Sequence, residues 1–119
     1  MSDIRGVGLD LCEIRRMNSW LEKPTYLNRV FTEQEQAYAL SRGATAPSSL
    51  AAMWAAKEAF CKALGCGIAF PLTDIEIVHD EGRPSYRLHG EAEKRADGCR
   101  AFLSLTHEAG VAGAVCILI

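Results

Sequence analysis

The sequence predicts an α+β fold in which a mainly antiparallel sheet packs against one long central helix. Residues 50–65 form an apolar, alanine-rich stretch with helical spacing. Five segments show the alternation or apolar content typical of strands: 4–14, 73–79, 86–89, 102–107 and 111–119. Turn sequences at 80–84 and 108–110 join the last four strands into two hairpins. The order strand, helices, hairpin, helix, hairpin favours separate layers of helix and sheet.

The central helix carries little charge. One side is apolar, formed by Leu50, Met53, Trp54, Phe60, Cys61 and Leu64. Alanines fill most of the rest, so we expect burial nearly all round, against its own domain and a second chain. Lys57 lies near the middle of the apolar stripe, where a lysine must snorkel or find an anion.

Glu58 and Lys62 stand four residues apart, on one strip with Ala51 and Ala55. Small residues beneath a carboxylate and an ammonium leave room for a ligand. The alternative is an exposed ion pair that contributes about 0.2–0.5 kcal/mol to the helix.

Shorter helices are expected around these elements. One follows Ile14 and breaks at Lys23-Pro24, a second covers 26–30, and a short one covers 91–99. Another begins with Thr32 as N-cap and Glu35 as its capping-box partner, and it ends near 42–43. Ser48 or Ser49 is expected to cap the central helix.

Length and composition fit a single domain over 1–119. The 13 basic and 15 acidic residues give a net charge of −2, so the overall charge favours neither nucleic acid nor an acidic membrane as partner. The N-terminus lacks signal-peptide features, and no apolar run is long enough to span a bilayer. Five cysteines without a C-x-x-C pair suggest buried thiols and a cytoplasmic protein.

Candidate catalytic residues come from separate segments. Asp10 shares the face of the first strand that carries Gly6 and Gly8, where glycine often marks close approach of another group. It could also be a strand-end turn former. Asp10 and Glu58 are hard oxygen donors, and two carboxylates with phosphate oxygens suit Mg²⁺.

Lys62 and His107 could then hold phosphate charge or move a proton. The rival interpretation is a glycosidase pair formed by Asp10 and Glu58, which leaves the lysines and glycines unexplained. A lone histidine such as His107 is more often structural than catalytic, and spacing does not decide between these alternatives.

Four segments in chain order resemble the 4′-phosphopantetheinyl transferase superfamily. They are Gly-Val-Gly-Leu-Asp with the following residues to 16, Phe-Thr-Glu-Gln-Glu at 31–35, Ala-Ala-Lys-Glu-Ala and onward at 55–68, and Leu-Ser-Leu-Thr-His at 103–107. Their order and the short chain are similar to the small holo-acyl-carrier-protein synthase type, over essentially the whole sequence.

The resemblance implies an enzyme that moves the phosphopantetheine arm of coenzyme A onto a serine of apo acyl carrier protein and releases adenosine 3′,5′-bisphosphate. It implies that Asp10 and Glu58 hold Mg²⁺ on the pyrophosphate. Lys62 would contact phosphate and help proton transfer, which makes these three the implied catalytic residues. Whether Glu58, a metal-bound water or Lys62 takes the serine proton stays open.

The resemblance also assigns coenzyme A contacts to Lys62, Thr106 and His107, with Gly65 and Gly67 allowing close backbone approach. Arg15 and Arg16 would dock the acidic recognition helix of the carrier protein. Small members of the family form homotrimers with coenzyme A between subunits, which requires a heterologous interface.

The sequence departs from the family pattern at three positions. Met53 stands where arginine commonly helps hold the nucleotide end of coenzyme A, Trp54 replaces phenylalanine, and Thr106 replaces a frequent serine. Two alternatives therefore accompany the active transferase: a catalytically weak homologue that binds carrier protein and coenzyme A, and a synthase specialised for a secondary-metabolism carrier protein.

Overall fold

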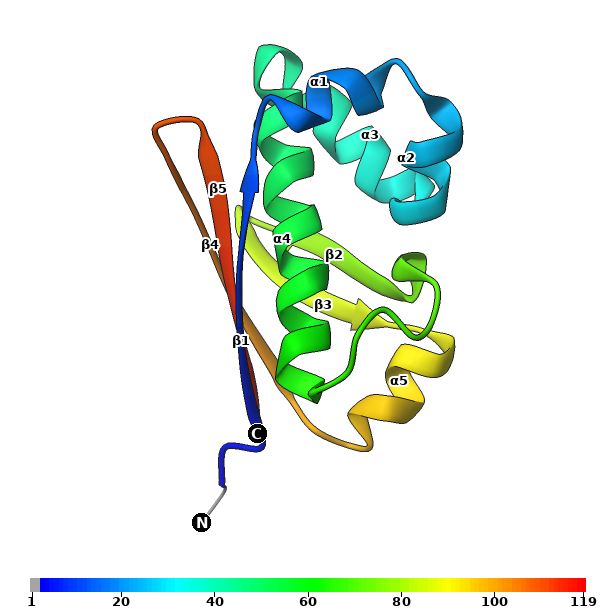
Figure 1. Ribbon diagram of the computed structural model, residues 1–119, viewed down its shortest axis with the longest axis vertical. Helices are drawn as coiled ribbons and strands as arrows, with labels where there is room; N and C mark the ends of the chain where they lie inside the picture. Colours follow the sequence, from blue (N-terminus) through cyan, green and yellow to red (C-terminus); the bar gives the residue numbers. More distant parts are fainter. Residues whose placement is uncertain (1–2) are drawn as a thin grey trace.

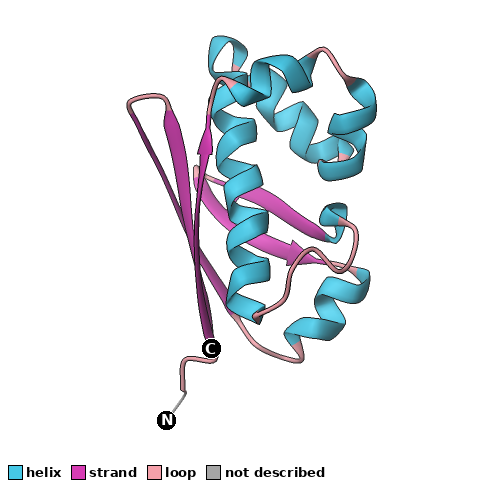
Figure 2. Ribbon diagram, in the orientation of Figure 1, coloured by secondary structure: helices cyan, strands magenta, loops and turns pink. Residues whose placement is uncertain are grey.

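The computed structural model describes residues 3–119 and confirms the α+β prediction (Figure 1). The elements in chain order are β1 Gly6–Glu13, α1 Arg16–Leu21, α2 Pro24–Val30, α3 Glu33–Ser41, α4 Ala46–Leu64, β2 Ile75–Asp80, β3 Arg83–Leu88, α5 Gly90–Ala96, β4 Ala101–Glu108 and β5 Val111–Leu118. Helix α4 runs through the middle, with β1, β4 and β5 on one side and the shorter helices on the other (Figure 2).

All strand pairs are antiparallel, but the strands form two sheets. Strand β5 lies between β1 and β4 in a three-stranded sheet, and β2 pairs with β3 in a separate hairpin. Helix α4 packs on the inner face of the three-stranded sheet, chiefly against β1 and β5. Strands β1 and β4 are therefore the two edges of that sheet.

Two glycines allow β1 to lie directly against α4. A Cβ atom added to Gly6 would collide with the carbonyl of Ala63, and one added to Gly8 would collide with the carbonyl of Ala59. The prediction that these glycines mark a close approach is confirmed, and the approaching group is the α4 backbone. Asp10, the next residue on the same face of the strand, is thereby brought beside α4.

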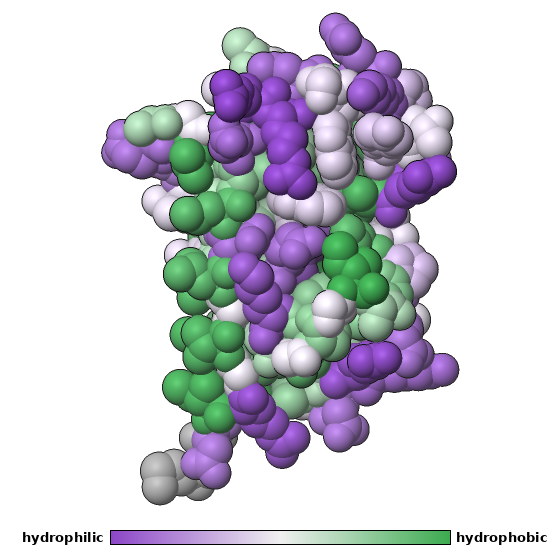
Figure 3. Space-filling model, viewed as in Figure 1, coloured by the Kyte–Doolittle hydropathy of each residue, from purple (hydrophilic) through white to green (hydrophobic). Residues whose placement is uncertain are grey.

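The apolar side chains of β1 point outward instead of into the core. Val7, Leu9 and Leu11 are 57%, 62% and 66% exposed, and Phe102 on β4 is also exposed. Figure 3 shows apolar side chains in a column along this edge of the molecule. We name Val7, Leu9, Leu11 and Phe102 the outer sheet patch. A contiguous exposed apolar patch of this kind is typical of an interaction surface.

Helix α4 starts earlier than the sequence prediction. It begins at Ala46 with Pro47 in its first turn, and Thr45 is the N-cap residue without a side-chain cap bond. The predicted cap at Ser48 or Ser49 is therefore wrong, because proline, with its fixed φ, suits the first turn of a helix and both serines lie inside.

Ala51 and Ala55 do not leave room for a ligand, which corrects a second prediction. Both are fully buried, so these small side chains let neighbouring elements of the same chain pack closely on the helix. The prediction that α4 is short of exposed surface is confirmed, since Lys62 is its one solvent-exposed residue and the others are buried or partly buried.

Lys57 finds an internal anion. Its ammonium lies 2.9 Å from Oε1 of Glu35, and both side chains are fully buried. The predicted capping box of α3 is present: Thr32 Oγ1 accepts from the Glu35 N–H, and Glu35 Oε1 accepts from the Thr32 N–H. One carboxylate thus caps α3 and neutralises the lysine of α4.

Smaller boundary differences have local causes. A 3₁₀ turn over Leu72–Asp74 delays β2 to Ile75. Helix α5 ends at Ala96 and not at 99, because Asp97 adopts the left-handed conformation, with φ of 49°. Within residues 3–119, no helix combines the length and apolar character needed to cross a membrane.

Candidate functional site

Asp10 and Lys62 meet at the β1 edge of the sheet. The Lys62 ammonium donates to Asp10 Oδ1 and to the Leu9 carbonyl, each at 3.1 Å. The Asp10 side chain is mostly buried, whereas that of Lys62 is half exposed. The ammonium therefore holds Asp10 from one side while keeping an exposed surface that a phosphate could reach.

Glu58 lies close to this pair. Burial is the main cause that raises the pKa of Glu58, and the negative charge of Asp10 raises it further. The charges of Lys62 and Arg16 act in the opposite direction. The carboxylates of Glu58 and Asp10 thus repel each other at a site where a bound cation would relieve the repulsion.

The donor set fits magnesium better than a transition metal. Across residues 3–119, no cluster of three or more His, Cys, Asp or Glu side chains could hold a metal ion. Mg²⁺ commonly takes only one or two carboxylates and completes its shell with water and substrate phosphate oxygens. Asp10 and Glu58 supply those two carboxylates.

The two arginines that follow β1 occupy different environments. Arg16 lies over the Trp54 ring, with its guanidinium carbon 5.2 Å from the ring centroid. Arg15 forms an exposed ion pair with Glu13 at 2.9 Å. Arg16 is therefore held by a cation–π contact next to Asp10, Glu58 and Lys62, which we name the carboxylate site. Arg15 instead faces solvent.

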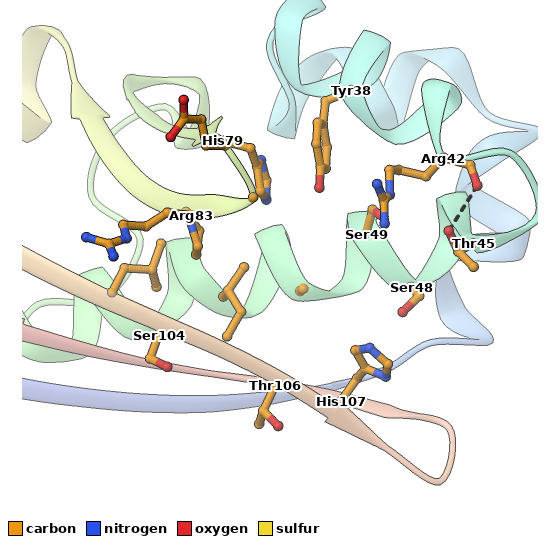
Figure 4. Close-up of a pocket in the computed structure, with 16 residues that line it drawn as sticks. Tyr38, Arg42, Thr45, Ser48, Ser49, His79, Arg83, Ser104, Thr106 and His107 are labelled. Atoms are coloured by element: carbon orange, nitrogen blue, oxygen red, sulfur yellow. Dashed lines mark hydrogen bonds between the residues drawn. The ribbon is translucent and has the colours of Figure 1, made fainter.

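A pocket opens at the other edge of the sheet, between β4, α4 and the β2–β3 turn (Figure 4). Its lining includes Tyr38, Arg42, Ser48, His79, Arg83 and His107. Two arginines beside an aromatic wall suit a flat, negatively charged ligand.

The aromatic wall is a stack of two rings. Tyr38 and His79 lie parallel, with centroids 3.7 Å apart and an angle of 4° between planes. Arg42 covers Tyr38 with its guanidinium carbon 5.9 Å from the ring centroid. Burial, followed by the charge of Arg42, lowers the pKa of His79. In the described chain its Nδ1 is buried without a hydrogen-bond partner.

Thr106 and His107, two of the residues expected to contact coenzyme A, both border the pocket, but their side chains point to opposite faces of β4. His107 points into the pocket, toward the side of Ser48, whereas the Thr106 side chain points to the opposite face of β4 (Figure 4). The Thr106 methyl accordingly approaches Gly113 from the same face as the Leu11 side chain. Gly65 ends α4 near Lys62 with φ of 77° and has open space around its Cα.

Two of the three sequence departures, Met53 and Trp54, lie outside the pocket, whereas Thr106 is among the residues that line it. Met53 is fully buried in the core, and Trp54 packs edge-on against Trp20 with centroids 5.3 Å apart. Neither residue lines the pocket as far as the structure describes it. The basic residues at this edge are instead Arg42 and Arg83.

The carboxylate site and the pocket, which are the two halves of the candidate site, lie apart in one chain. Asp10 is on edge strand β1, and His107 is on edge strand β4, with β5 between them. Two inter-strand spacings amount to about 10 Å. Helix α4 occupies the inner face of the intervening strand β5. Asp10, Glu58 and Lys62 are not among the described residues that line the pocket.

Sequence reasoning did not find Tyr38, Arg42, His79 or Arg83. Tyr38 lies on α3, Arg42 directly follows that helix, and His79 and Arg83 lie on β2 and β3. Each of them in isolation resembles an ordinary surface residue. Only the tertiary fold brings them together, so no spacing in the sequence could have identified the pocket.

Comparison with known proteins assigns the family. Residues 6–116 match the family model described as the 4′-phosphopantetheinyl transferase superfamily. A holo-[acyl-carrier-protein] synthase of Treponema denticola is 44% identical over 120 residues, covering 97% of this chain and 98% of the relative.

Solved structures support the same family assignment. The acyl carrier protein synthase of Mycobacterium tuberculosis is 36% identical, with a TM-score of 0.77 and coverage of 98% of both chains. A synthase–coenzyme A complex from Chronobacterium ammoniagenes is 30% identical, with a TM-score of 0.83 and coverage of 98% of this chain and 97% of that chain. The chain belongs to the 4′-phosphopantetheinyl transferase superfamily and is of the holo-acyl-carrier-protein synthase type.

Proposed function

We propose that this enzyme transfers the 4′-phosphopantetheine group of coenzyme A to a serine of apo acyl carrier protein and releases adenosine 3′,5′-bisphosphate. The observation that carries the proposal is the grouping of Asp10 on β1 with Glu58 and Lys62 on α4, in a chain that is 44% identical to a holo-[acyl-carrier-protein] synthase. A reaction at phosphorus needs this combination of anionic metal ligands and a cation for phosphate.

Asp10 and Glu58 would hold Mg²⁺ through one carboxylate each. When bound, the ion neutralises charge on the pyrophosphate and on the phosphoryl group during transfer. The Lys62 ammonium keeps Asp10 in place and leaves an exposed surface for a phosphate oxygen. Glu58 would accept the serine proton, because burial raises its pKa and makes its carboxylate a stronger base than an ordinary glutamate.

The pocket at the β4 edge would take the adenosine 3′,5′-bisphosphate end of coenzyme A. Arg42, Arg83 and His107 provide cationic or hydrogen-bonding groups for phosphate, and the Tyr38–His79 stack provides an aromatic wall for adenine. This arrangement substitutes for the arginine that the family commonly has at the position of Met53. It favours the active transferase over a homologue that only binds.

A homotrimer would join the two halves of the site. One subunit would supply Asp10, Glu58 and Lys62, and its neighbour would supply the pocket that contains His107. The outer sheet patch offers an apolar surface for a second copy of the chain. Thr106 faces the same side of the sheet as Leu11, which belongs to this patch. Thr106 would therefore reach coenzyme A bound across the interface.

The carrier protein would dock beside the carboxylate site. Arg16 is fixed over Trp54 and lies close enough to Glu58 to lower its pKa. Arg15 adds a second exposed positive charge. Acidic side chains of the carrier would meet these cations, which positions the attacking serine near Glu58.

The five cysteines carry free thiols, which supports a cytoplasmic location.

The test is intact-mass spectrometry of an apo acyl carrier protein incubated with the enzyme, coenzyme A and Mg²⁺. We expect a gain of one phosphopantetheine mass that disappears with a chelator. Glu58→Gln should abolish the gain while circular dichroism stays unchanged. No gain on several carrier proteins, with the enzyme folded, would establish the binding-only homologue instead.

A further inference from the structure

The C-terminus of α4 is closed by a pair of reverse hydrogen bonds. The Gly65 N–H donates to the Lys62 carbonyl at 3.0 Å, and the Cys66 N–H donates to the Cys61 carbonyl at 3.1 Å. Gly65 adopts the left-handed conformation that this closure requires. This is a Schellman motif, in which the residue after the glycine folds back over the last helical turn. Here the two residues brought together are both cysteines.

The two cysteines differ in accessibility. Cys61 is 2% exposed, whereas Cys66 is partly exposed. Burial raises the pKa of Cys61 to about 12, and its interaction with the Cys66 side chain contributes to the increase. Cys61 therefore stays a protonated, shielded thiol at neutral pH, and Cys66 is the thiol that solvent reaches.

The backbone geometry suits a bridge between them. Disulfides join residues whose Cα atoms lie ~4.4–6.8 Å apart. A direct N–H to carbonyl bond between Cys66 and Cys61 holds their backbones close across one turn. A soft-metal site is the other use of neighbouring thiols, but within residues 3–119 no group of three or more His, Cys, Asp or Glu side chains could hold such an ion.

We propose that Cys61 and Cys66 form a redox pair that a peroxide converts into an intramolecular disulfide. The Cys66 thiolate attacks one peroxide oxygen, the O–O bond breaks, and Cys66 becomes a sulfenic acid while hydroxide leaves. The Cys61 sulfur then attacks the Cys66 sulfur. The S–O bond breaks, and the Cys61 proton leaves with the hydroxyl group as water. Peroxide is reduced and the two thiols are oxidised.

The bridge would enclose the end of α4 that carries Lys62 and Gly65. Where the proposed transferase function holds, the disulfide restrains the Lys62 turn, and oxidation lowers the transfer rate until a dithiol reductant restores it. This effect on activity rests on the proposed function, whereas formation of the disulfide does not.

Peptide mapping of the peroxide-treated protein tests the pair. After free thiols are blocked, trypsin cuts after Lys57, Lys62 and Arg87, because Pro84 prevents cleavage after Arg83. Cys61 and Cys66 therefore fall in different peptides, 58–62 and 63–87. We expect these two peptides to be joined, with a mass two hydrogens below their sum, and to separate on reduction.

Cys99→Ser is the matched control, because Cys99 is partly exposed but lies elsewhere in the fold. This variant should give the same joined peptides, whereas Cys66→Ser should leave Cys61 unoxidised. Separate peptides in the wild type, or Cys66 bridged to another cysteine or a second chain, would overturn the proposal. A joined pair without loss of transfer would overturn only the effect on activity.

Discussion

Replacing Lys57 by methionine should strongly destabilise the fold. The Lys57 ammonium donates to Glu35 Oε1 at 2.9 Å, to the Leu72 carbonyl at 2.9 Å and to the Ile75 carbonyl at 2.6 Å. Methionine has similar length and suits an apolar interior, so packing changes little. The perturbation is therefore the loss of the positive charge and of three donors.

The expected loss is about 3–5 kcal/mol in the free energy of unfolding, because removal of one partner leaves the Glu35 carboxylate buried without a countercharge. Two carbonyl acceptors lose their donor as well. A domain is typically stable by only about 5–15 kcal/mol, so this loss is a large share of the total.

Urea denaturation followed by circular dichroism measures the effect, with Lys62→Met as the matched control. Lys62 is on the same helix but half exposed, so its replacement should change stability by no more than about 0.5 kcal/mol. Transfer activity should fall in the Lys62 variant. A loss below about 1 kcal/mol for Lys57→Met would refute the claim that Lys57 is needed to compensate the buried Glu35 carboxylate.

A double variant separates charge from packing. Glu35→Gln combined with Lys57→Met removes both charges, while the glutamine carbonyl can still accept from the Thr32 or Ile77 N–H. Part of the stability lost in Lys57→Met should return, because the uncompensated charge is gone. If the double variant is less stable than Lys57→Met, the hydrogen bonds that the Glu35 carboxylate accepts outweigh the cost of its unpaired charge.

Two further predictions concern the carboxylate site. The raised pKa of Glu58 means that the folded state binds its proton more tightly than the unfolded state, so this group stabilises the fold at low pH and that contribution is lost as pH rises through the folded pKa. Glu58→Gln should therefore melt at a higher temperature than wild type at pH 7, with no difference below the ordinary glutamate pKa; a lower melting temperature at pH 7 would contradict this. Arg16→Glu should raise the KM for carrier protein more than the KM for coenzyme A, and equal changes in both would remove Arg16 from docking.

Much of the fold could be predicted because local signals agreed with the tertiary structure. The Thr32–Glu35 capping box and the apolar helix through Lys57 are both present. The close contact marked by Gly6 and Gly8 was also predictable, since a glycine in a strand has few other uses.

The remaining features depend on contacts that no local pattern encodes. The start of α4 was misplaced because Pro47 looks like a loop residue until the preceding turn is known. The side of β1 that faces outward could not be inferred, because Leu9 is as apolar as a core residue. The Tyr38–His79 stack joins residues far apart in sequence, and its partners carry no shared motif.

We expect one active site to combine the carboxylate site of one subunit with the pocket of another. Two inactive variants test it most directly: Glu58→Gln, and a pocket variant that combines Arg42→Glu with His107→Ala. The two chains are coexpressed with different affinity tags, and assemblies that carry both tags are purified and assayed for transfer to apo carrier protein.

In a cyclic trimer that contains both variants, one interface always pairs an intact carboxylate site with an intact pocket. Mixed assemblies should therefore recover about one third of wild-type activity, while each variant alone stays inactive. Mixed assemblies as inactive as the separate variants would contradict the shared site and place both halves of the chemistry within one chain.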